Sequence, residues 1–424
     1  MASDHVVFQM HSPVQDWDDP VDAFGWFSRG YPSGTSSPTD TDGRMTNEIK
    51  EIASITGNVV SFTSPLSIGY RVNHLAQLTQ YTVNSTNGGP QVTMAGVENL
   101  TINGGTDGNL RFNITSYCWA KNVEITNWVG EGIDVSNSFR VEVRDSYIHT
   151  GAEPTPGGGG YAFSVENGSS EILFENNISR DVNKVMVDRA SGAGSVFAYN
   201  YTDDGWISYS PTWQEVGINA SHMGGGHHVL MEGNYSFNMD TDYTHGSSQY
   251  MTYFRNYVTG QRGSWTGTDA NSRAAGVASW SKAFSFIGNV MGRPGQMAGW
   301  TYVDPMMGCD ANGGNCVGGV SGQWGNGGIG NIWQLGYDAT NEWSQEAELG
   351  ALSTVQRDGN FDFLTNSQRW HTTPAGFTIP NSLYLTAEPA FFHGSTWPWS
   401  NPANGAIYAL PAKARYDAGT PNSP

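Results

Sequence analysis

The chain repeats one strand-like unit: ILFENNIS at residues 172–179, VFAYNYT at 196–202, LMEGNYS at 230–236, TYFRNYV at 252–258 and FSFIGNVMG at 284–292. Three weaker copies precede these five: VENLTINGG at 97–105, VEITNWV at 123–129 and VEVRDSYI at 141–148. Apolar and polar residues alternate in each copy, which indicates β-strands rather than helices. The sequence therefore predicts a repeat protein built from short strands.

Each copy contains one Asn or Asp at a comparable place, which we call the anchor. Consecutive anchors lie 18 to 34 residues apart: Asn103, Asn127, Asp145, Asn177, Asn200, Asn234, Asn256 and Asn289. Both residue types tolerate the left-handed backbone of a tight turn, and stacked Asn side chains can form an amide ladder. A coil of three short strands with one constant turn, repeated about every 20 to 25 residues, describes a right-handed parallel β-helix.

Over residues 95–295 these repeats resemble the pectin-lyase-like superfamily of β-helix proteins. The resemblance implies an all-β fold, a single-stranded right-handed parallel β-helix. It also implies a polysaccharide partner, because the superfamily consists chiefly of polysaccharide lyases and glycoside hydrolases. The same fold carries non-catalytic adhesins and phage tailspikes, so the activity has to be argued from the site.

We divide the chain into three parts around this repeat. Residues 1–94 are expected to be a leading segment with an N-terminal β cap, because residues 46–83 alternate like strands. Residues 95–296 are expected to hold the β-helix coils. Residues 297–424 show little repeat signal, so we expect them to close the C-terminal end and pack along the flank instead of forming a separate domain.

The charge balance excludes several classes of partner. The 424 residues contain 20 Lys and Arg against 39 Asp and Glu, a formal net charge of -19, without any basic run. Nucleic acid and an anionic membrane are poor partners for such a chain. No stretch approaches the roughly 20 apolar residues of a membrane span. The scarcity of lysine and the abundance of Asn, Ser and Thr suit a secreted or extracellular monomer.

Three cysteines are too few for a dense disulfide framework. Cys118 lies between Tyr117 and Trp119, without a pattern of basic neighbours to lower the pKa of its thiol, so we expect a buried free thiol. Cys309 and Cys316 flank a Gly- and Asn-rich hexapeptide and could close a small loop. The sequence leaves the bridged and the unbridged form of this pair equally open.

Each coil leaves room for a third strand upstream of the anchor, at 110–114, 132–136, 161–166, 184–188, 217–222 and 240–245. Side chains alternate across a sheet, so one set should fill the core: Phe112, Ile133, Val135, Phe163, Val165, Val185, Val187, Ile218 and Ala220. The other set should face outward: Arg111, Asn113, Asp134, Ser136, Ser164, Glu166, Lys184, Asp188, Asn219 and Ser221. The outward face is therefore polar and suited to binding.

Ionisable residues fall at one level of that face when they are counted back from the anchors. Asp134, Glu166 and His245 lie 11 residues before an anchor, and Asp188 and His222 lie 12 residues before one. Coils stacked roughly 5 Å apart would align these side chains in a column. Carboxylates at that separation shift each other's pKa values, which is the arrangement that acid and base catalysis needs.

Insertions after the anchors at 145, 200 and 256 return to the edge of this face and should wall a groove. Carboxylates beside Trp and Tyr suit a sugar site, because the rings stack on pyranose faces and the acids act on the glycosidic oxygen or on water. The predicted catalytic residues are Asp203 or Asp204 as general acid, Asp188 or Glu166 as base, and His222 to orient one of them. The residues predicted to bind substrate are Asp134, Lys184, Arg189, Trp206, Tyr209, Trp213, Glu215, Asp242 and His245.

The predicted activity is glycoside hydrolysis by paired carboxylates, with no cofactor and no metal. A net charge of -19 repels polyuronates, which favours a neutral or amino-substituted polysaccharide. The first alternative is a Ca²⁺-dependent polysaccharide lyase that acts by β-elimination on a uronate polymer, with Asp188 and Glu166 as calcium ligands. The second is a non-catalytic glycan-binding adhesin or tailspike-like domain. Two plainer interpretations also compete: Asp203 and Asp204 as a turn, and Lys184 and Arg189 as ion-pair partners of Asp188.

Overall fold

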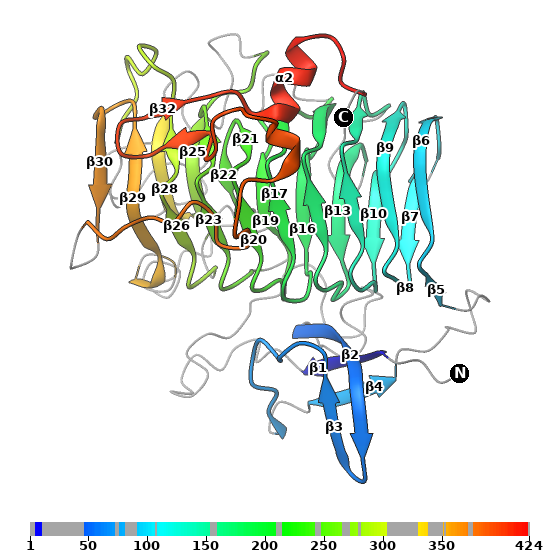
Figure 1. Cartoon of the computed structure of the whole chain (residues 1–424). Helices are drawn as coiled ribbons and strands as arrows, with labels where there is room; N and C mark the ends of the chain where they lie inside the picture. The colour runs from blue at the N-terminus through cyan, green and yellow to red at the C-terminus, as the bar shows by residue number, and fades with distance from the viewer. Residues whose placement is uncertain are drawn as a thin grey trace.

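Segments of alternating polarity form short strands that stack coil upon coil into a solenoid (Figure 1). The computed structural model describes residues 5–10, 46–72, 76–80, 91–106, 108–152, 159–208, 214–241, 247–264, 272–278, 281–302, 330–337, 351, 353–371 and 376–422. Three faces of parallel strands run along the solenoid, which we call sheets I, II and III. The expected right-handed parallel β-helix is confirmed.

Sheet I collects the predicted third strands, all in parallel pairing with their neighbours. In chain order its strands are β7 (Leu110–Asn113), β10 (Glu131–Ser136), β13 (Tyr161–Glu166), β16 (Met186–Arg189), β19 (Ile218–Met223), β22 (Met239–Asp240), β25 (Arg273–Ala278) and β28 (Asn331–Tyr337).

Sheets II and III hold the strands on either side of the repeated turn. Sheet II consists of β11 (Glu142–Arg144), β14 (Leu173–Glu175), β17 (Val196–Ala198), β20 (Leu230–Glu232), β23 (Thr252–Phe254) and β26 (Ser285–Ile287). Sheet III consists of β12 (Tyr147–His149), β15 (Ile178–Val182), β18 (Tyr201–Gly205), β21 (Tyr235–Ser236), β24 (Tyr257–Val258) and β27 (Val290–Met291). Three longer strands run through both sheets: β6 (Gly96–Asn103), β9 (Trp119–Thr126) and β29 (Gln356–Asp362).

A buried asparagine ladder joins the coils at the turn between sheets II and III. From Asn200 onward, each ladder Asn accepts two hydrogen bonds on Oδ1 from the preceding coil, one from a backbone N–H and one from an amide Nδ2. Asn177, the first of them, accepts the backbone N–H of Ser146. The Nδ2–Oδ1 distances lie between 2.9 and 3.1 Å. The ladder consists of Asn177, Asn200, Asn234, Asn256, Asn289 and Asn360. Every polar atom of these buried amides therefore has a partner, which favours one fixed stacking.

The ladder corrects three of the eight predicted anchors. Asp145 lies one residue early, because Ser146 occupies the ladder position and donates its backbone N–H to Asn177 Oδ1 (2.9 Å). Asn103 and Asn127 lie beyond the turn, where their exposed side chains bond to each other (3.0 Å). In the first coils, asparagine instead supplies the left-handed residue just before the ladder position, as at Asn122 (φ 53°).

The interior of the solenoid is apolar, as the alternation predicts. All nine predicted core residues are buried. Eight of them belong to the main core cluster, and Val187 is the exception. Aromatic rings stack inside the coils, as between Phe163 on sheet I and Phe174 on sheet II, whose ring centroids are 3.7 Å apart. Cys118 is a buried free cysteine, as predicted, whereas Cys309 and Cys316 lie outside the described residues.

The coils continue past residue 296, where we expected them to end. β28 adds a strand to sheet I, and β29 pairs with both β26 and β27. β30 (Ser367–Trp370) then pairs antiparallel with β29. Asn360 lies 71 residues after Asn289 in the sequence, far beyond the repeat length, so the repeat pattern could not predict that it belongs to the ladder.

The N-terminal β segment lies beside the solenoid and not over its first coil (Figure 1). It is an antiparallel sheet of β1 (His5–Met10), β2 (Thr46–Thr56), β3 (Val59–Phe62) and β4 (Gln77–Gln80). The start of β2 crosses the turns between sheets I and II: Ile49 packs on Phe139 and donates its backbone N–H to Ser170 Oγ (2.9 Å). The first coil itself is joined by β5 (Val92–Thr93), which pairs with β8 (Thr115–Ser116).

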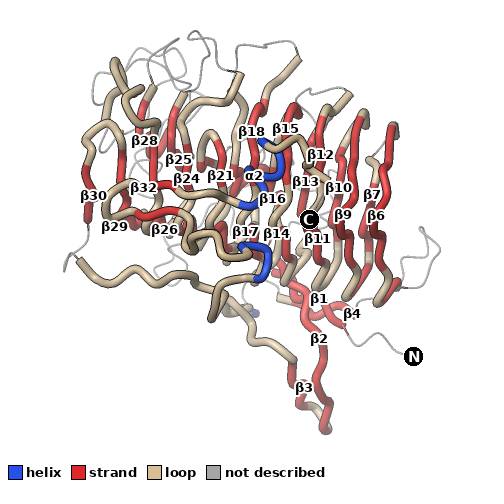
Figure 2. Tube along the Cα trace, turned by 45° about the horizontal axis from the view of Figure 1, so that its top comes forward, coloured by secondary structure: helices blue, strands red, loops and turns tan. Residues whose placement is uncertain are grey.

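Residues 376–422 form a C-terminal arm that runs back along the outside of the solenoid (Figure 2). Its elements are the 3-10 helix η2 (Ala390–Phe392), β31 (Ser400–Asn401), β32 (Ala406–Ile407) and α2 (Pro411–Asp417). Trp399 Nε1 donates to Gly233 O (2.7 Å), and Arg415 Nη2 donates to Asn176 O (2.6 Å). The arm therefore packs along the flank. Among the described residues, no helix is long and apolar enough to cross a membrane.

The ladder predicts a large effect of Asn234→Ala on stability. This change leaves the donors of Asn200 and the carbonyl of Phe197 without their buried partner, at a cost of about 1–3 kcal/mol for each lost group. Chemical denaturation should show a loss of several kcal/mol. Asn103→Ala, which removes an exposed amide pair, is the control and should change stability little. Equal effects of the two variants would contradict the ladder's role.

Candidate active site

Sheet I turns a row of polar side chains outward, and the strand register fixes their order. Asp134 on β10 pairs with Arg111 on β7 and Ser164 on β13. Glu166 pairs with Ser136 on one side and Arg189 on the other. Partners in a parallel ladder point to the same side of a sheet. Asp134 and Glu166 therefore share the outer face on adjacent coils, two residues apart along the strand.

The single column predicted from anchor counting is wrong. Asp134, Ser164 and Asn219 mark one level, yet they precede the ladder positions Ser146, Asn177 and Asn234 by 12, 13 and 15 residues. The turns between sheets I and II differ in length, so a constant count from the ladder does not return to a constant level.

Asp188 faces the interior of the solenoid and not the outer face. It pairs in register with the core residue Val165 and has no exposed surface. Val185 and Met186 both belong to the core, so the alternation breaks at the start of β16 and the following residues exchange sides. Asp188 Oδ1 accepts the backbone N–H of Ser191 (2.8 Å), and burial raises the pKa of Asp188 to about 7. The residue cannot meet a polymer lying on the outer face.

The outer face brings three carboxyl groups and two guanidinium groups together, which we call the carboxylate cluster: Glu131, Asp134, Glu166, Arg111 and Arg189. Arg189 Nη1 lies 2.7 Å from Glu131 Oε1 and 3.3 Å from Glu166 Oε2. Arg111 Nε lies 3.2 Å from Asp134 Oδ2. Two cations therefore face three acids, so the cluster cannot be fully neutralised while all three carboxyl groups are ionised.

Asp134 is the member of the cluster that keeps its proton. Burial raises the pKa of Asp134 to about 8, and the nearby charges of Glu166 and Glu131 act in the same direction. The Arg111 side chain lowers this pKa less, because it is 48% exposed and solvent screens its charge. Burial also raises the pKa of Glu131. The cluster thus places a carboxyl group that favours its protonated form, Asp134, beside two further carboxyl groups.

His222 lies beside the cluster, bonded to a tyrosine. Tyr161 Oη and His222 Nε2 are 3.0 Å apart, and both side chains are buried. The guanidinium carbon of Arg189 lies 5.6 Å from the centre of the Tyr161 ring. Lys184 Nζ pairs with Glu215 Oε1 at 2.9 Å, and its amino group lies 5.8 Å from the same ring. The predicted ion pairs with Asp188 therefore do not form, because Lys184 and Arg189 bind other carboxylates.

Asp203 and Asp204 lie on a different sheet from the carboxylate cluster. Both belong to β18 of sheet III, where Asp203 Oδ1 accepts the backbone N–H of Gly263 and Asp204 Oδ1 that of Ser264, each at 2.8 Å. Arg180 pairs with Asp204. The two carboxylates thus bind a neighbouring loop. They are buried, which differs from the solvated turn that the sequence also allowed.

Trp206 follows β18 directly and donates its Nε1–H to Asp181 Oδ1 (2.9 Å), so it also belongs to the edge of sheet III. The other predicted substrate-binding residues of the insertions, Tyr209, Trp213, Asp242 and His245, lie outside the described residues.

The anchor count missed two members of this site, Glu131 and Tyr161. Both stand at the first position of their strands, and they are partners in the register of β10 and β13. Alternation assigns that position to the core side, and the ion pairs with Arg189 (2.7 Å) and Arg111 (3.9 Å) show that Glu131 reaches the outer face. The sequence feature that could have identified Glu131 is its place as a Glu at the very start of an alternating apolar strand.

The described residues hold no group of three or more His, Cys, Asp or Glu side chains arranged to bind a metal ion. The calcium pair suggested by the sequence, Asp188 and Glu166, lies on opposite sides of sheet I, because Asp188 pairs with Val165 and Glu166 with Arg189. These two carboxylates cannot share one ion.

The solved structures that this protein resembles are β-helix proteins at low sequence identity. A tailspike protein of Pseudomonas phage LKA1 aligns over 71% of this chain and 42% of its own, with 12% identity and a TM-score of 0.43. A pectate lyase of Bacillus sp. N165, in complex with trigalacturonate, aligns over 55% of this chain and 72% of its own, with 15% identity and a TM-score of 0.27. DFA-IIIase from Arthrobacter chlorophenolicus A6 aligns over 64% of this chain and 62% of its own, with 12% identity and a TM-score of 0.31.

The chain spans less than half the length of the two phage tailspikes that it matches, 42% and 48%. No protein-family profile matches the sequence, and no curated protein is significantly similar to it. The strand pairings therefore establish the fold, and the function has to be inferred from the residues of the site.

The buried carboxyl group of Asp188 predicts a pH-dependent stability. Its pKa in the folded protein, about 7, lies above the ordinary 3.8, so the folded state favours the neutral form. Raising the pH from 5 to 8 should therefore cost the folded state up to about 2.5 kcal/mol. Asp188→Asn cannot ionise, so denaturation at the two pH values should show a smaller drop than in the parent protein. An unchanged drop would mean that Asp188 is ionised throughout.

Proposed function

We propose that this protein is a glycoside hydrolase that cleaves a neutral polysaccharide on the outer face of sheet I. The observation that carries the proposal is the carboxylate cluster, in which a protonated Asp134 lies on the coil next to Glu166. Hydrolysis of a glycosidic bond needs this combination, one carboxylic acid to protonate the leaving oxygen and one carboxylate to act on the anomeric carbon or on water.

Asp134 would act as the general acid, because it holds a proton at neutral pH and loses it only near pH 8. Glu166 would act as the carboxylate partner, since its side chain reaches solvent and pairs with Arg189. Arg189 binds Glu131 and Glu166 together and is a positioning residue. Tyr161 and His222 are buried beside the cluster and bond to each other, so they would act as positioning residues behind Arg189.

The net charge of -19 supports a neutral polymer at this site, because an acidic face repels a polyuronate. Such an enzyme would act outside the cell as a monomer, without a cofactor. The lyase alternative needs a free basic group to abstract a proton. The basic side chains of the cluster are Arg111 and Arg189, and both are paired with its carboxyl groups. Glu166 and the other acids that face Arg189 also raise its pKa, so neither group is well suited to that step.

The two alternatives predict different products. Wild-type protein should release reducing ends from a neutral polysaccharide panel, without new ultraviolet absorbance and without sensitivity to a chelator. Asp134→Asn and Glu166→Gln should each lower the turnover at least about 100-fold, the range of general acid–base catalysis, with little change in the melting temperature. Glu388→Gln, on the exposed C-terminal arm, is the matched control. Chelator-sensitive release of ultraviolet-absorbing products would instead support a lyase, and binding without any turnover an adhesin.

The charges around Asp134 predict the pH dependence of the activity. A general acid must be protonated, so kcat/KM should fall as the pH rises through about 8. Glu131 raises the pKa of Asp134 and Arg111 lowers it. Glu131→Gln should therefore move the alkaline limb of the profile to lower pH, and Arg111→Gln should move it to higher pH. Shifts in the same direction would contradict the assignment of the limb to Asp134.

A further inference from the structure

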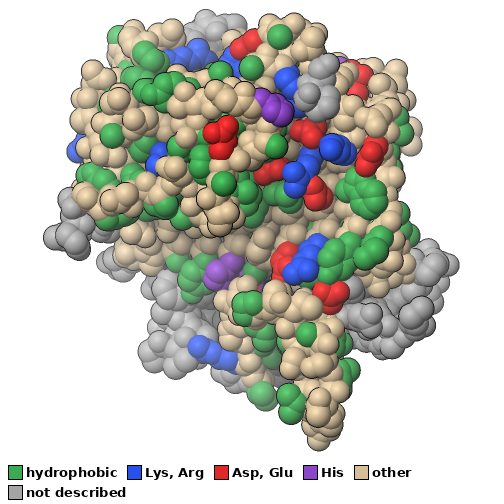
Figure 3. Space-filling model, in the orientation of Figure 1, with side chains coloured by type: hydrophobic (Ala, Val, Ile, Leu, Met, Phe, Trp, Pro, Cys, Tyr) green, Lys and Arg blue, Asp and Glu red, His purple; other side chains and the backbone are tan. Residues whose placement is uncertain are grey.

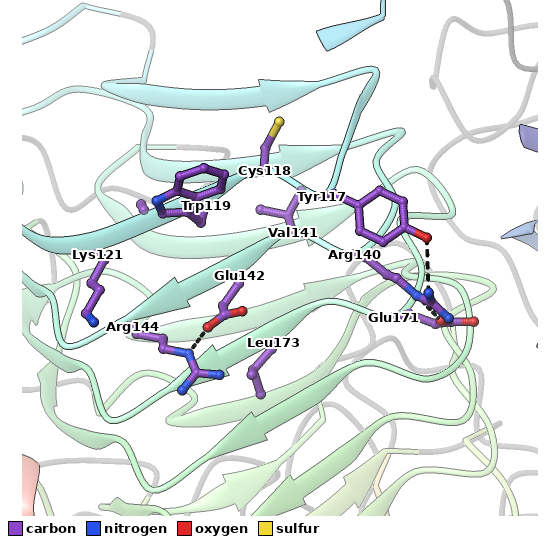
Figure 4. Close-up of a pocket in the computed structure, with 11 residues that line it drawn as sticks. Tyr117, Cys118, Trp119, Lys121, Arg140, Val141, Glu142, Arg144, Glu171 and Leu173 are labelled. Atoms are coloured by element: carbon purple, nitrogen blue, oxygen red, sulfur yellow. Dashed lines mark hydrogen bonds and ion pairs between the residues drawn. The ribbon is translucent and has the colours of Figure 1, made fainter. Parts of the chain in front are cut away.

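A groove of about 480 Å³ lies on the outer face of sheet II, away from the carboxylate cluster (Figure 4). Trp119 and Lys121 on β9 and Glu142 and Arg144 on β11 line it, with Leu173 on β14. The register places them in two rows across the strands: Trp119, Glu142 and Leu173 in one row, and Lys121 and Arg144 in the other. The floor is formed by sheet II itself, so the groove has a rigid base.

The indole of Trp119 is held flat against the sheet. A Cβ atom at Gly96 would lie 2.0 Å from Trp119 Cε2 and 2.2 Å from Nε1, so the ring covers the glycine of the neighbouring strand. Trp119 Nε1 donates to Glu98 Oε1 at 2.7 Å. The ring is thus fixed before any ligand arrives, and a preorganised aromatic plane costs little entropy on binding.

The groove carries charges of both signs, with the basic residues Lys121, Arg140 and Arg144 beside the acidic residues Glu142 and Glu171. Lys121 and Arg144 are directly opposite in the register of β9 and β11, and like charges in that position repel. Arg144 pairs with Glu142 and, at 3.0 Å, with Glu175. Lys121 is exposed and makes no ion pair with a described residue. Because Glu142 and Glu175 already compensate Arg144, Lys121 is the charge with which an anionic group of a ligand could pair.

Fixed side chains border the groove. Arg140, which lines it, binds Glu171 Oε2 (2.7 Å) and the hydroxyl group of Tyr117 (3.1 Å), so its charge is already compensated. Beside the groove the C-terminal arm reaches sheet II, where the Tyr384 hydroxyl donates to Glu175 Oε1 (2.5 Å). Figure 3 shows acidic and basic side chains gathered on this face, over the N-terminal half of the solenoid. The arm covers sheet II up to the groove and leaves the groove open.

We infer that the groove is a second saccharide site, which binds a pyranose residue carrying a carboxylate. The sugar face would stack on the Trp119 ring, and its carboxylate would lie beside Lys121 and Arg144. This inference extends the proposed function: the substrate would be a heteropolysaccharide whose acidic residues are held on sheet II and whose neutral linkages are cut on sheet I. A heteropolysaccharide with scattered acidic residues carries less negative charge than a uniform polyuronate. The net negative charge of the protein therefore repels it less.

Calorimetry on the full chain tests the site with glucuronate, galacturonate and mannuronate trimers, each compared with the neutral trimer of the same linkage. At least one acidic trimer should bind more tightly than its neutral counterpart, and added salt should weaken it. Lys121→Gln should weaken that binding about tenfold and leave the neutral trimer unaffected. Trp119→Ala should weaken the binding of both. Lys413→Gln, on the C-terminal arm, is the matched control and should change neither.

The inference is overturned if no acidic trimer binds, or if Lys121→Gln leaves its affinity unchanged while circular dichroism shows a folded protein. The measurements are repeated in Asp134→Asn protein, so that binding is read without turnover. Loss of binding in Lys121→Gln with no turnover by the wild type would defeat the proposed hydrolase activity and leave the second site standing. Normal turnover with no acidic-trimer binding would defeat the second site alone.

Discussion

The hydrogen bonds of the buried asparagine ladder fix how one coil lies on the next. Each ladder Asn bonds both the backbone and the side chain of its neighbour, as Asn200 does with Asn234 at 3.0 and 2.9 Å. A buried amide that lost these partners would be costly, so slippage between coils is disfavoured. Residues that are distant in the sequence therefore lie next to each other on adjacent coils. The carboxylate cluster on sheet I and the groove on sheet II both depend on this placement.

The stacking of the coils brings charged side chains together on both sheet I and sheet II, but they are compensated in different ways on the two sheets. On sheet I, Glu131, Asp134 and Glu166 are brought together partly buried, and the mutual repulsion is relieved by a proton on Asp134. On sheet II, Lys121 and Arg144 are brought together at the surface, where Glu142 and Glu175 compensate Arg144 and solvent or a ligand can compensate Lys121. The same register thus yields an acid for catalysis on one face and a site for an anionic sugar on another.

The repeat of alternating residues around asparagine was enough to predict the fold, six of the eight strands of sheet I, and nine buried residues of which eight belong to the main core cluster. The sequence failed where local geometry departs from the repeat. Turns of unequal length moved Asp134 and Glu166 to different levels, and a break in alternation at Val185 and Met186 turned Asp188 inward. Asp203 and Asp204 looked catalytic as a pair of acids, but their bonds to the backbone of Gly263 and Ser264 depend on a loop 60 residues away, which no local pattern reveals.

The most direct measurement is the titration of the Asp134 carboxyl group by carbon NMR of protein labelled with ¹³C at aspartate, with Asp134→Asn used to assign the signal. We predict a carboxyl resonance that keeps the chemical shift of the protonated acid at pH 7, titrates near pH 8, and is absent from the variant. A resonance that is fully ionised by pH 5 would remove the general acid from the carboxylate cluster and contradict the account.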